Sequence, residues 1–350
     1  MPPRKLASKP KRKVEDEEGA KGAPAVKKDA EQAEQSGAES DDPKPKKKRA
    51  KKDPVTPIHS HLPTNLTVPD PLQPFPRPAD GTMRISSFNV AGLRASEKKG
   101  FSRYVIAEDA DILVVTETKT AAIALEALDD RYPFRYWGDS AKKGQAGTAV
   151  FSKVEPVNVT YGLPNGGEDV SLAESKGRCV TLEFANSFVI GTYVPNAGAG
   201  LKNLPDKVAW NRAFERYLRE LDAKKPVIWC GDLNVVPTDK DIRNWKTNYN
   251  KSAGCTDDEI NGFNAQLNPS DESGHKKLVD VWRHLNPDEE GYYTYQSYKF
   301  QCRSKGIGWR LDYFVVSERV MEKVKACEMR HEIWGASDHL PLVVDIEGPL

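Results

Sequence analysis

The chain of 350 residues has few cysteines and no long apolar run. Its five cysteines are odd in number, scattered from Cys179 to Cys327, and never spaced as C-x-x-C. This pattern argues against a disulfide framework and against a zinc site made of paired thiolates. No apolar run of about 18 residues and no secretory signal core is present, so we expect a soluble, intracellular protein without a membrane partner.

Apolar side chains are scarcest near the N-terminus. Hydrophobic residues make up 38% of the chain, but residues 1–80 hold 14 of the 25 prolines, no cysteine and Phe75 as their only aromatic residue. Such a segment cannot bury enough apolar surface to offset its ordering entropy. We therefore predict a disordered tail over residues 1–80 and one folded domain over residues 81–350, long enough for a single large core.

Two dense basic runs lie in this tail. They are Lys9–Lys13 (KPKRK) and Lys44–Lys52 (KPKKKRAKK), and acidic stretches separate them. Runs of this density suit a nuclear import receptor or a nucleic-acid backbone, and a merely solvated tail is the alternative. We predict a nuclear protein whose tail binds an import receptor. The net charge of the chain is only +1, so charge alone does not mark the folded part as a nucleic-acid binder.

Short apolar, β-branched runs recur along residues 81–350, and several are apolar on both faces, as in strands covered by other layers. The expected strands are Arg84–Val90, Asp111–Thr116, Gly147–Ser152, Cys179–Phe184, Ser187–Val194, Pro226–Gly231, Leu311–Val316 and Leu342–Ile346. Residues 210–221 carry apolar side chains at helical spacing, which predicts an amphipathic helix. Hairpin-like links and helical crossovers together predict mixed sheets with helices outside, an α/β fold of the α+β type.

Polar side chains lie repeatedly at the ends of these strands. They are Asn89, Glu117, Tyr193, Asn196, Asp232, Asn234, Asp312, Asp338 and His339. Any one of them has an ordinary interpretation as a cap, a turn residue or a surface charge. Six strand ends that deliver acids, amides and a histidine favour one pocket at one rim of the sheets.

Two of these carboxylates suggest a metal site. Glu117 and Asp338 offer the hard oxygen ligands that Mg²⁺ prefers, and Mg²⁺ usually takes only one or two protein carboxylates plus waters and phosphate oxygens. The lack of nearby cysteine or paired histidine makes zinc a poorer candidate. We therefore predict a Mg²⁺ site, at which Mn²⁺ could substitute.

The other side chains suit the attack of water on a phosphodiester. Asp312 and His339 suggest a carboxylate that orients an imidazole and stabilises its protonated form. No serine or cysteine nucleophile has a suitable setting, so water is the expected nucleophile and Asp232 its general base. The expected hydrogen-bond donors to an oxyanion are Tyr193, Asn196 and Asn234. A metal, a base and donors together predict a Mg²⁺-dependent phosphoester hydrolase.

These residues are embedded in the strings FNVAGLR, VVTETK, GTYVPNAG, CGDLNV, GWRLDYF and SDHLP, in this order. In these strings, from about Arg84 to Ile346, the chain resembles the exonuclease III/apurinic-apyrimidinic endonuclease branch of the endonuclease–exonuclease–phosphatase superfamily. GDLN and SDH indicate only the superfamily, whereas YVPNAG and GWRLDYF are much more specific to the DNA-repair branch.

The resemblance implies a four-layer sandwich of two mixed β-sheets flanked by helices. It also implies hydrolysis of the phosphodiester 5′ to an abasic site in double-stranded DNA. The products would be a 3′-hydroxyl and a 5′-deoxyribose phosphate, and a weaker 3′ exonuclease or 3′-phosphodiesterase activity would accompany the reaction.

The resemblance further implies a role for each matching residue. The residues expected at the metal are Asn89, Glu117, Asp232, Asn234, Asp338 and His339. The expected catalytic residues are Tyr193, Asp232, Asn234, Asp312 and His339. The residues expected on the DNA are Arg94, Lys119, Arg178 and Asn196 at the backbone, and Tyr295, Trp309 and Leu311 around the flipped-out sugar. An abasic nucleotide lacks stacking and pairing and costs little to extrude, although ordinary core packing would equally explain Tyr295 and Trp309.

The chain departs from the family pattern at several positions. Ala91 stands where an acid or amide is usual, so the metal shell loses an oxygen ligand or a water anchor, and residues 144–146 lack a usual aromatic. Ala199 and Lys299 replace an arginine and a methionine that wedge into the duplex in vertebrate members. Ser86 replaces the cysteine on which the redox role of some vertebrate members depends, so we do not transfer that role.

Three hypotheses follow. The first is an active abasic-site endonuclease, acting as a monomer by default. The second is a phosphoesterase of the same fold that acts on RNA or on a small phosphoester, but the apolar sugar pocket in GWRLDYF argues against a small substrate. The third is a damage-binding protein with impaired catalysis. The joint presence of Glu117, Asp232, Asn234, Asp312 and His339 argues against the third.

Overall fold

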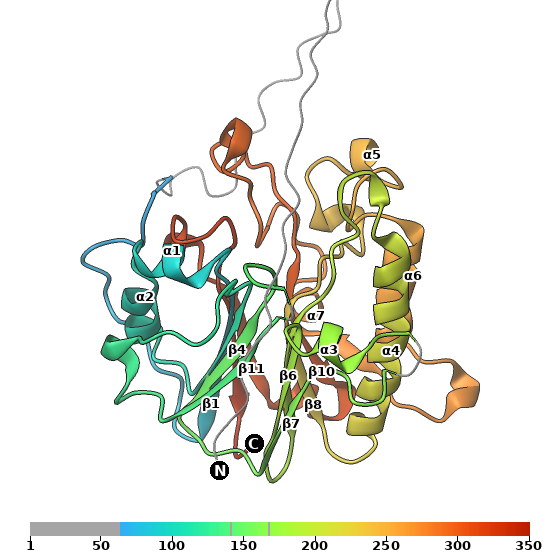
Figure 1. The fold of residues 1–350 in the computed structure, drawn as a ribbon, viewed down its shortest axis with the longest axis horizontal. Coiled ribbons are helices and arrows are strands. Elements are labelled where there is room, and N and C mark those ends of the chain that lie inside the picture. Colours follow the sequence, from blue (N-terminus) through green and yellow to red (C-terminus); the bar gives the residue numbers. More distant parts are fainter. Residues whose placement is uncertain (1–63, 141, 167–168) are drawn as a thin grey trace, which may run out of the picture. The chain divides into compact units, whose positions relative to one another are not determined.

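The computed structural model describes residues 64–140, 142–166 and 169–350, which contain two six-stranded sheets (Figure 1). The first sheet runs β11 (Val324–Met329), β12 (Leu342–Glu347), β1 (Thr82–Asn89), β2 (Ile112–Thr116), β4 (Thr148–Ser152) and β3 (Phe134–Gly138). The second runs β5 (Asn158–Tyr161), β6 (Cys179–Glu183), β7 (Phe188–Tyr193), β8 (Val227–Asp232), β10 (Asp312–Ser317) and β9 (Leu278–Asp280).

Helices connect these strands. The α-helices are α1 (Leu93–Glu97), α2 (Phe101–Glu108), α3 (Leu172–Ser175), α4 (Leu204–Asp222), α5 (Trp245–Asn248), α6 (Asp257–Leu267) and α7 (Val281–Leu285). The short 3-10 helices are η1 (Glu126–Leu128), η2 (Ala199–Leu201), η3 (Asp239–Asp241), η4 (Asp271–Ser273), η5 (Lys299–Gln301), η6 (Glu318–Lys323) and η7 (His331–Ile333).

Three apolar clusters separate four layers. The central cluster fills the space between the sheets, with Ile85 and Val114 from the first sheet and Ile228 and Phe314 from the second. A second cluster packs α4 and α6 against the second sheet, and a third packs α2 against the first. Figure 1 shows α1 and α2 outside one sheet and α4 and α6 outside the other. The predicted four-layer sandwich is therefore confirmed.

Both sheets are mixed, as predicted. β1 pairs in parallel with β2, and β7 pairs in parallel with β8, whereas the other strand pairs are antiparallel. All eight predicted strands are present, as β1, β2, β4, β6, β7, β8, β10 and β12, and the predicted helix lies within α4. The four strands that the sequence pattern did not predict are β3, β5, β9 and β11, and each is the edge of a sheet.

The folded body begins before residue 81. Val68 is fully buried, and Leu72 and Phe75 pack against the cluster around α2. The amides of Val68 and Phe75 donate to the carbonyl oxygens of Lys99 and Ala107 at 2.8 and 2.9 Å. The boundary predicted at residue 81 therefore lies too far along the chain, because an extended proline-rich segment still delivers apolar side chains to the core. Residues 1–63 of the predicted tail, with both basic runs, lie outside the described residues.

The five cysteines are all buried, and none pairs with another. Among the described residues, no helix is long and apolar enough to cross a membrane. The covalent frame of this domain therefore has no disulfide, and the apolar clusters hold its layers together.

Candidate active site

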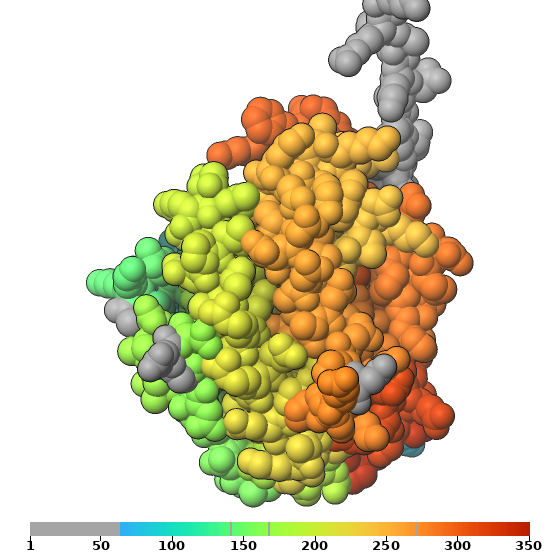
Figure 2. Space-filling view, turned by 90° about the vertical axis from the view of Figure 1, so that its right-hand side faces the viewer, coloured from blue at the N-terminus to red at the C-terminus, as the bar shows by residue number. Residues whose placement is uncertain are grey.

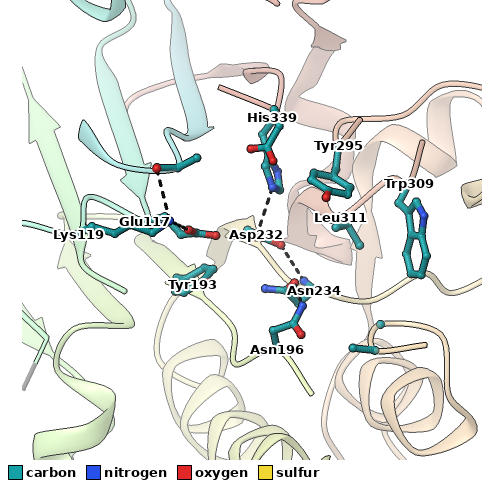
Figure 3. Close-up of a pocket in the computed structure, with 14 residues that line it drawn as sticks. Glu117, Lys119, Tyr193, Asn196, Asp232, Asn234, Tyr295, Trp309, Leu311 and His339 are labelled. Carbon is teal, nitrogen blue, oxygen red and sulfur yellow. Dashed lines mark hydrogen bonds and ion pairs between the residues drawn. The ribbon is translucent and has the colours of Figure 1, made fainter. Parts of the chain in front are cut away.

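A pocket of about 380 Å³ opens at one rim of the sheets (Figure 3). It is lined by Ala91, Glu117, Lys119, Tyr193, Asn196, Asp232, Asn234, Ala253, Gly254, Tyr295, Trp309, Leu311, Asp338 and His339. All but four of the predicted site residues are in this lining. The exceptions are Asn89 and Asp312, which are fully buried behind it, and Arg94 and Arg178, which lie outside it. The strand ends thus meet in one place, as the sequence pattern predicted.

Strand register brings three polar residues of the second sheet side by side. Tyr193 at the end of β7 pairs with Asp232 at the end of β8, and Asp232 pairs with Asp312 at the start of β10. In the first sheet, the end of β1 at Asn89 pairs with Thr116, so that Glu117 follows directly. Neighbouring strands lie about 5 Å apart, so this register alone concentrates carboxylates at the rim.

Asn89 joins the two sheets at the floor of the pocket. Its side-chain amide donates to Glu117 Oε1 at 3.0 Å and to Asp232 Oδ2 at 2.8 Å. Its Oδ1 accepts the amide of Ala91 at 3.0 Å. Both hydrogens of its side-chain amide and one lone pair of Oδ1 hold two acids and one turn, which explains why a fully buried amide ends β1.

A carboxylate–imidazole pair faces Asp232 from the same floor. Asp312 Oδ2 lies 2.7 Å from His339 Nδ1, and His339 Nε2 lies 4.0 Å from Asp232 Oδ2. The amide of Asp312 donates to Thr294 Oγ1 at 3.0 Å, which fixes the start of β10. The imidazole is thus held from one side by a buried carboxylate and presents its other nitrogen to the pocket.

Burial and neighbouring charges shift the pKa values of Asp232 and His339 by different amounts. Burial raises the pKa of Asp232 to about 7, and the nearby charges of Asp312 and Glu117 add to the rise. Burial by itself lowers the pKa of His339, but the charge and hydrogen bond of Asp312 outweigh burial and raise it to about 10. At neutral pH the imidazole is therefore protonated, while Asp232 is present in both its protonated and its ionised form.

Four lining residues other than glycine have left-handed backbone conformations. Their φ angles are 50° at Ala91, 52° at Glu117, 54° at Lys119 and 50° at Asn234. This conformation costs a residue with a side chain roughly 1–2 kcal/mol, so surrounding contacts must stabilise it. Backbone strain of this kind concentrates at functional sites, where it aims side chains that regular strands would turn away.

Hydrogen bonds fix the polar wall around Asn234. Its amide donates to Asp232 Oδ1 at 2.9 Å, and its side-chain amide donates to the carbonyl of Val194 at 3.0 Å. Asn196 donates to Asn234 Oδ1 at 2.8 Å. The two asparagines therefore form one unit beside Asp232, and Figure 3 shows them together on the wall below it.

Tyr193 and Lys119 complete the polar side of the pocket, and two arginines lie near it but outside its lining. Burial and the charges of Glu117 and Asp232 raise the pKa of Tyr193, so its phenol stays protonated. The Arg178 guanidinium lies 5.1 Å from the centre of the Tyr193 ring. Lys119 Nζ lies 2.7 Å from Glu117 Oε2, whereas Arg94 donates to Thr120 Oγ1 at 3.2 Å, outside the pocket.

The opposite wall is apolar. Tyr295 and Trp309 form an isolated antiparallel bridge, with hydrogen bonds of 2.8 and 2.9 Å between their backbones, and Leu311 lies beside them. The Tyr295 ring centre is 4.9 Å from that of His339. The three side chains also pack with a small apolar cluster around Val236 and Ile242, so they line the pocket on one side and join the core on the other (Figure 3).

Phe300 is a residue that the sequence pattern did not single out. It lies in η5, between Tyr295 and Trp309 in the chain, and is 81% exposed. Its φ is 59°, that of Gln301 is 56°, and Lys305 donates to its carbonyl at 2.7 Å. A single exposed apolar side chain is ordinary on a protein surface, but this one lies on a turn with two left-handed residues, and backbone strain of that kind concentrates at functional sites. Lys299 beside it is the position that the resemblance compares with a wedge residue.

The donor set of the pocket fits a hard divalent cation better than zinc. No three His, Cys, Asp or Glu side chains in the described part of the chain are grouped so as to hold a metal by themselves. A site with one or two carboxylates, an amide and waters matches the habits of Mg²⁺. Glu117 and Asp338 line the pocket, and Asn89 is bonded to Glu117.

Comparison with protein families matches residues 86–339 to the Endonuclease/Exonuclease/phosphatase family. The chain belongs to this family. It is 39% identical over 276 residues to the DNA-(apurinic or apyrimidinic site) endonuclease of Dictyostelium discoideum, covering 78% of this chain and 73% of that protein. It is 42% identical over 267 residues to an exodeoxyribonuclease of Bacillus subtilis, covering 75% of this chain and all of that protein (100%).

Among solved structures, the AP endonuclease LMAP from Leishmania major matches this member of the family with a TM-score of 0.64 and 28% identity. The match covers 79% of this chain and 93% of that one. The Endonuclease/Exonuclease/phosphatase family generally depends on a divalent metal, in agreement with the oxygen-rich lining of the pocket.

Proposed function

We propose that this protein is a Mg²⁺-dependent DNA-repair endonuclease that hydrolyses the phosphodiester 5′ to an abasic site. It leaves a 3′-hydroxyl and a 5′-deoxyribose phosphate and has secondary 3′ exonuclease or 3′-phosphodiesterase activity. One observation carries the proposal: hydrolytic groups and an apolar cage share one pocket. The names of the relatives, an abasic-site endonuclease and an exodeoxyribonuclease, support the same substrate class.

Asp232 is the general base for the attacking water. Its carboxylate is almost fully buried, and hydrogen bonds from Asn89 and the amide of Asn234 fix its orientation. A pKa raised to about 7 by burial places its proton affinity near the working pH, which is the best value for a general base. The base form dominates above that value.

The protonated His339 and the neutral Tyr193 stabilise charge on the phosphate. The imidazolium donates from Nε2 while Asp312 holds Nδ1, and the phenol of Tyr193 donates toward the phosphate or the leaving oxygen. Asn196 and Asn234 add donors from the same wall. Donors that are already fixed before the reaction lose no energy to reorganisation when charge develops.

Glu117, Asp338 and Asn89 are the residues proposed to hold Mg²⁺. When bound, Mg²⁺ supplies Lewis-acid stabilisation of the phosphate oxygens. Lys119 now pairs with Glu117 at 2.7 Å, and it is free to turn to a DNA phosphate when a cation takes that carboxylate. The resemblance also expects Asp232, Asn234 and His339 near the metal, and all three lie around the same pocket.

The apolar wall is the proposed seat of the baseless sugar. Tyr295, Trp309 and Leu311 offer a surface against which a deoxyribose without a base packs. Arg94, Lys119 and Arg178 are the proposed contacts to the backbone. An abasic nucleotide leaves the duplex easily because nothing stacks on it or pairs with it.

We further propose a nuclear protein that acts as a monomer, with its basic runs as the import signal. The composition of Lys9–Lys13 and Lys44–Lys52 supports this assignment.

One assay tests the function. A duplex with a single tetrahydrofuran abasic-site analogue is incubated with the full chain in Mg²⁺ or in chelator. We expect incision on the 5′ side of the analogue only with the metal. Tight binding without incision would instead indicate a damage-binding protein, and no binding would exclude both functions.

Ala91→Asp is expected to lower the Mg²⁺ concentration that gives half the maximal incision rate. The new carboxylate would stand in the lining next to Asn89 and Glu117, and aspartate tolerates the left-handed φ of 50° better than alanine does. Ala253→Asp, on another part of the lining, is the control. An unchanged Mg²⁺ requirement in Ala91→Asp would show that this position does not serve the metal.

Phe300→Ser is expected to weaken binding of the abasic duplex by about 5- to 150-fold, the equivalent of about 1–3 kcal/mol of base–aromatic stacking. The side chain is 81% exposed, so its removal should cost little stability. Val157→Ser removes another exposed apolar side chain, before β5 and away from the pocket, and should leave the affinity unchanged. Equal affinities of Phe300→Ser and the parent protein would remove Phe300 from the DNA interface.

A further inference from the structure

A buried ion pair lies beneath the pocket wall, between the helices that cover the second sheet. Lys207 is in the first turn of α4 and Glu259 is in the first turn of α6, and they are 1% and 0% exposed. Lys207 Nζ lies 3.2 Å from Glu259 Oε1. Figure 2 shows the face that α4 and α6 cover, coloured from yellow-green to orange. Neither residue lines the pocket, and the mechanism above gives neither a role.

Lys207 binds the backbone of the segment that carries the general base. Its ammonium donates to the carbonyl oxygens of Asn234 and, at 3.4 Å, Leu233. Asn234 is one of the left-handed residues of the lining, and its amide donates to Asp232. A turn of the Asn234 peptide toward a relaxed conformation would break the bond to Lys207. The lysine therefore holds the strained peptide from behind.

Glu259 binds the segment that forms the adjoining wall. It closes a capping box with Thr256 at the start of α6, an ordinary role that needs only the amide and hydroxyl of Thr256. Both of its carboxylate oxygens also accept the amide of Gly254 at 2.8 Å. The Gly254 carbonyl in turn accepts the amide of Val236 at 2.8 Å, so one carboxylate connects two segments of the wall.

Gly254 fits tightly between the polar and apolar walls. A side chain at this residue would lie 3.1 Å from the Asn234 carbonyl oxygen and 3.4 Å from the Trp309 ring. Its φ of 87° also favours glycine. A small shift of Gly254 would therefore move the Trp309 side of the pocket relative to Asn234.

We propose that Lys207 and Glu259 are positioning residues, which lock residues 233–236 to residues 253–256 and so set the distance between the water-activating wall and the sugar-binding wall. The expected change in incision rate rests on the proposed function, whereas the expected rigidity of the two wall segments does not. A shift of about 1 Å in such a wall is enough to cost on the order of 10²-fold in rate. The substrate would still bind, because neither residue touches it.

The competing explanation is that the ion pair only stabilises the packing of α4 against α6. Removal of one partner of a buried pair strands the other charge and destabilises the fold, whereas replacement of both partners by neutral residues restores much of the stability. If the pair only stabilised the helix packing, the double variant would therefore recover both stability and activity. A positioning pair would recover stability alone, because the bonds to Asn234 and Gly254 are still missing or weakened.

The experiment compares five variants of the full chain: Lys207→Met, Lys207→Arg, Glu259→Gln, the double variant Lys207→Met/Glu259→Gln, and Arg84→Met. Arg84 is the matched control, because it forms a buried ion pair with Asp345 at 2.8 Å at the opposite end of β1 from Asn89. For each variant we would measure the thermal midpoint, the affinity for the tetrahydrofuran duplex and the single-turnover incision rate in Mg²⁺.

We expect Lys207→Met to lose about 100-fold in single-turnover rate with little change in DNA affinity. The double variant should recover the thermal midpoint but not the rate, and Lys207→Arg should recover much of the rate because a guanidinium keeps the donors. Arg84→Met should lower only the thermal midpoint. Full recovery of the rate in the double variant, or an equal loss of rate in Arg84→Met, would overturn the proposal.

Amide hydrogen exchange separates this inference from the proposed function. The amides of Asn234, Val236 and Gly254 should exchange faster in Lys207→Met and in Glu259→Gln, while those of β8 keep their protection. Unchanged exchange at these three amides would overturn the positioning role whatever the activity. If the parent protein incises no abasic duplex, the proposed function fails, and exchange alone decides whether the pair holds the wall.

Discussion

Asp232→Asn is expected to lower the single-turnover rate of incision by about 10²–10⁴-fold, the usual contribution of a general base. Asparagine keeps the size of the side chain and an oxygen for the amide of Asn234, but it cannot accept a proton from water. DNA affinity should be retained, because Asp232 is only 1% exposed and brings negative charge toward a phosphate. The measurement is rapid-quench incision of the tetrahydrofuran duplex with enzyme in excess.

Asp345→Asn is the matched control for this substitution. Asp345 is also a buried carboxylate, and it accepts two hydrogen bonds of 2.8 Å from Arg84 far from the pocket. We expect it to lower the thermal midpoint without changing the incision rate of the folded protein. A loss of less than about tenfold in Asp232→Asn would show that another group takes the proton.

The interior of the fold was predictable from the sequence, and its edges were not. Strands such as Ile112–Thr116 and Val227–Asp232 are buried on both faces, so their apolar runs are continuous. The edge strands Asn158–Tyr161 and Val324–Met329 carry exposed or partly buried side chains at most positions, so they show no continuous apolar run. Their strand conformation comes from pairing with a neighbour, which a local pattern does not contain.

Much of the site was predictable because several of its residues, such as Asn89, Tyr193 and Asp232, end strands, and strand ends collect at a rim. The sequence did not predict which of these residues are buried behind the pocket and which face it. Asn89 and Asp312 are fully buried and orient other side chains, whereas Glu117 and Lys119 face the pocket. Left-handed turns decide this difference, and they depend on contacts with distant segments.

Two signals in the sequence pointed to the ion pair beneath the wall. Lys207 lies three residues before Trp210 and seven before Phe214, so a lysine occupies the apolar stripe of its helix. Thr256 and Glu259 have the spacing of a capping box. Each signal has an ordinary explanation by itself, and only the folded chain brings the two charges together.

Asp312→Asn is expected to lower the incision rate by about 10²–10³-fold near pH 8, the usual effect of removing one donor to a developing oxyanion. The carboxylate lies 2.7 Å from His339 Nδ1 and is the main reason why the pKa of His339 is raised to about 10 against the effect of burial. With an amide in its place, burial is opposed only by the charges of Asp232 and Asp338, so the pKa of His339 should fall and less of the imidazole should be protonated at the working pH.

The pH dependence of the incision rate shows whether Asp312 acts by keeping His339 protonated. In the parent protein the rate should rise as Asp232 loses its proton near pH 7 and fall as His339 loses its proton near pH 10. In Asp312→Asn the alkaline fall should begin at lower pH, so the ratio of parent to variant rate should grow from about pH 6 to about pH 9. Asp312→Asn also removes a charge that raises the pKa of Asp232, whereas a neutral His339 no longer lowers that pKa, and these two effects on Asp232 oppose each other. A ratio that is constant with pH would mean that Asp312 positions the ring without holding its charge.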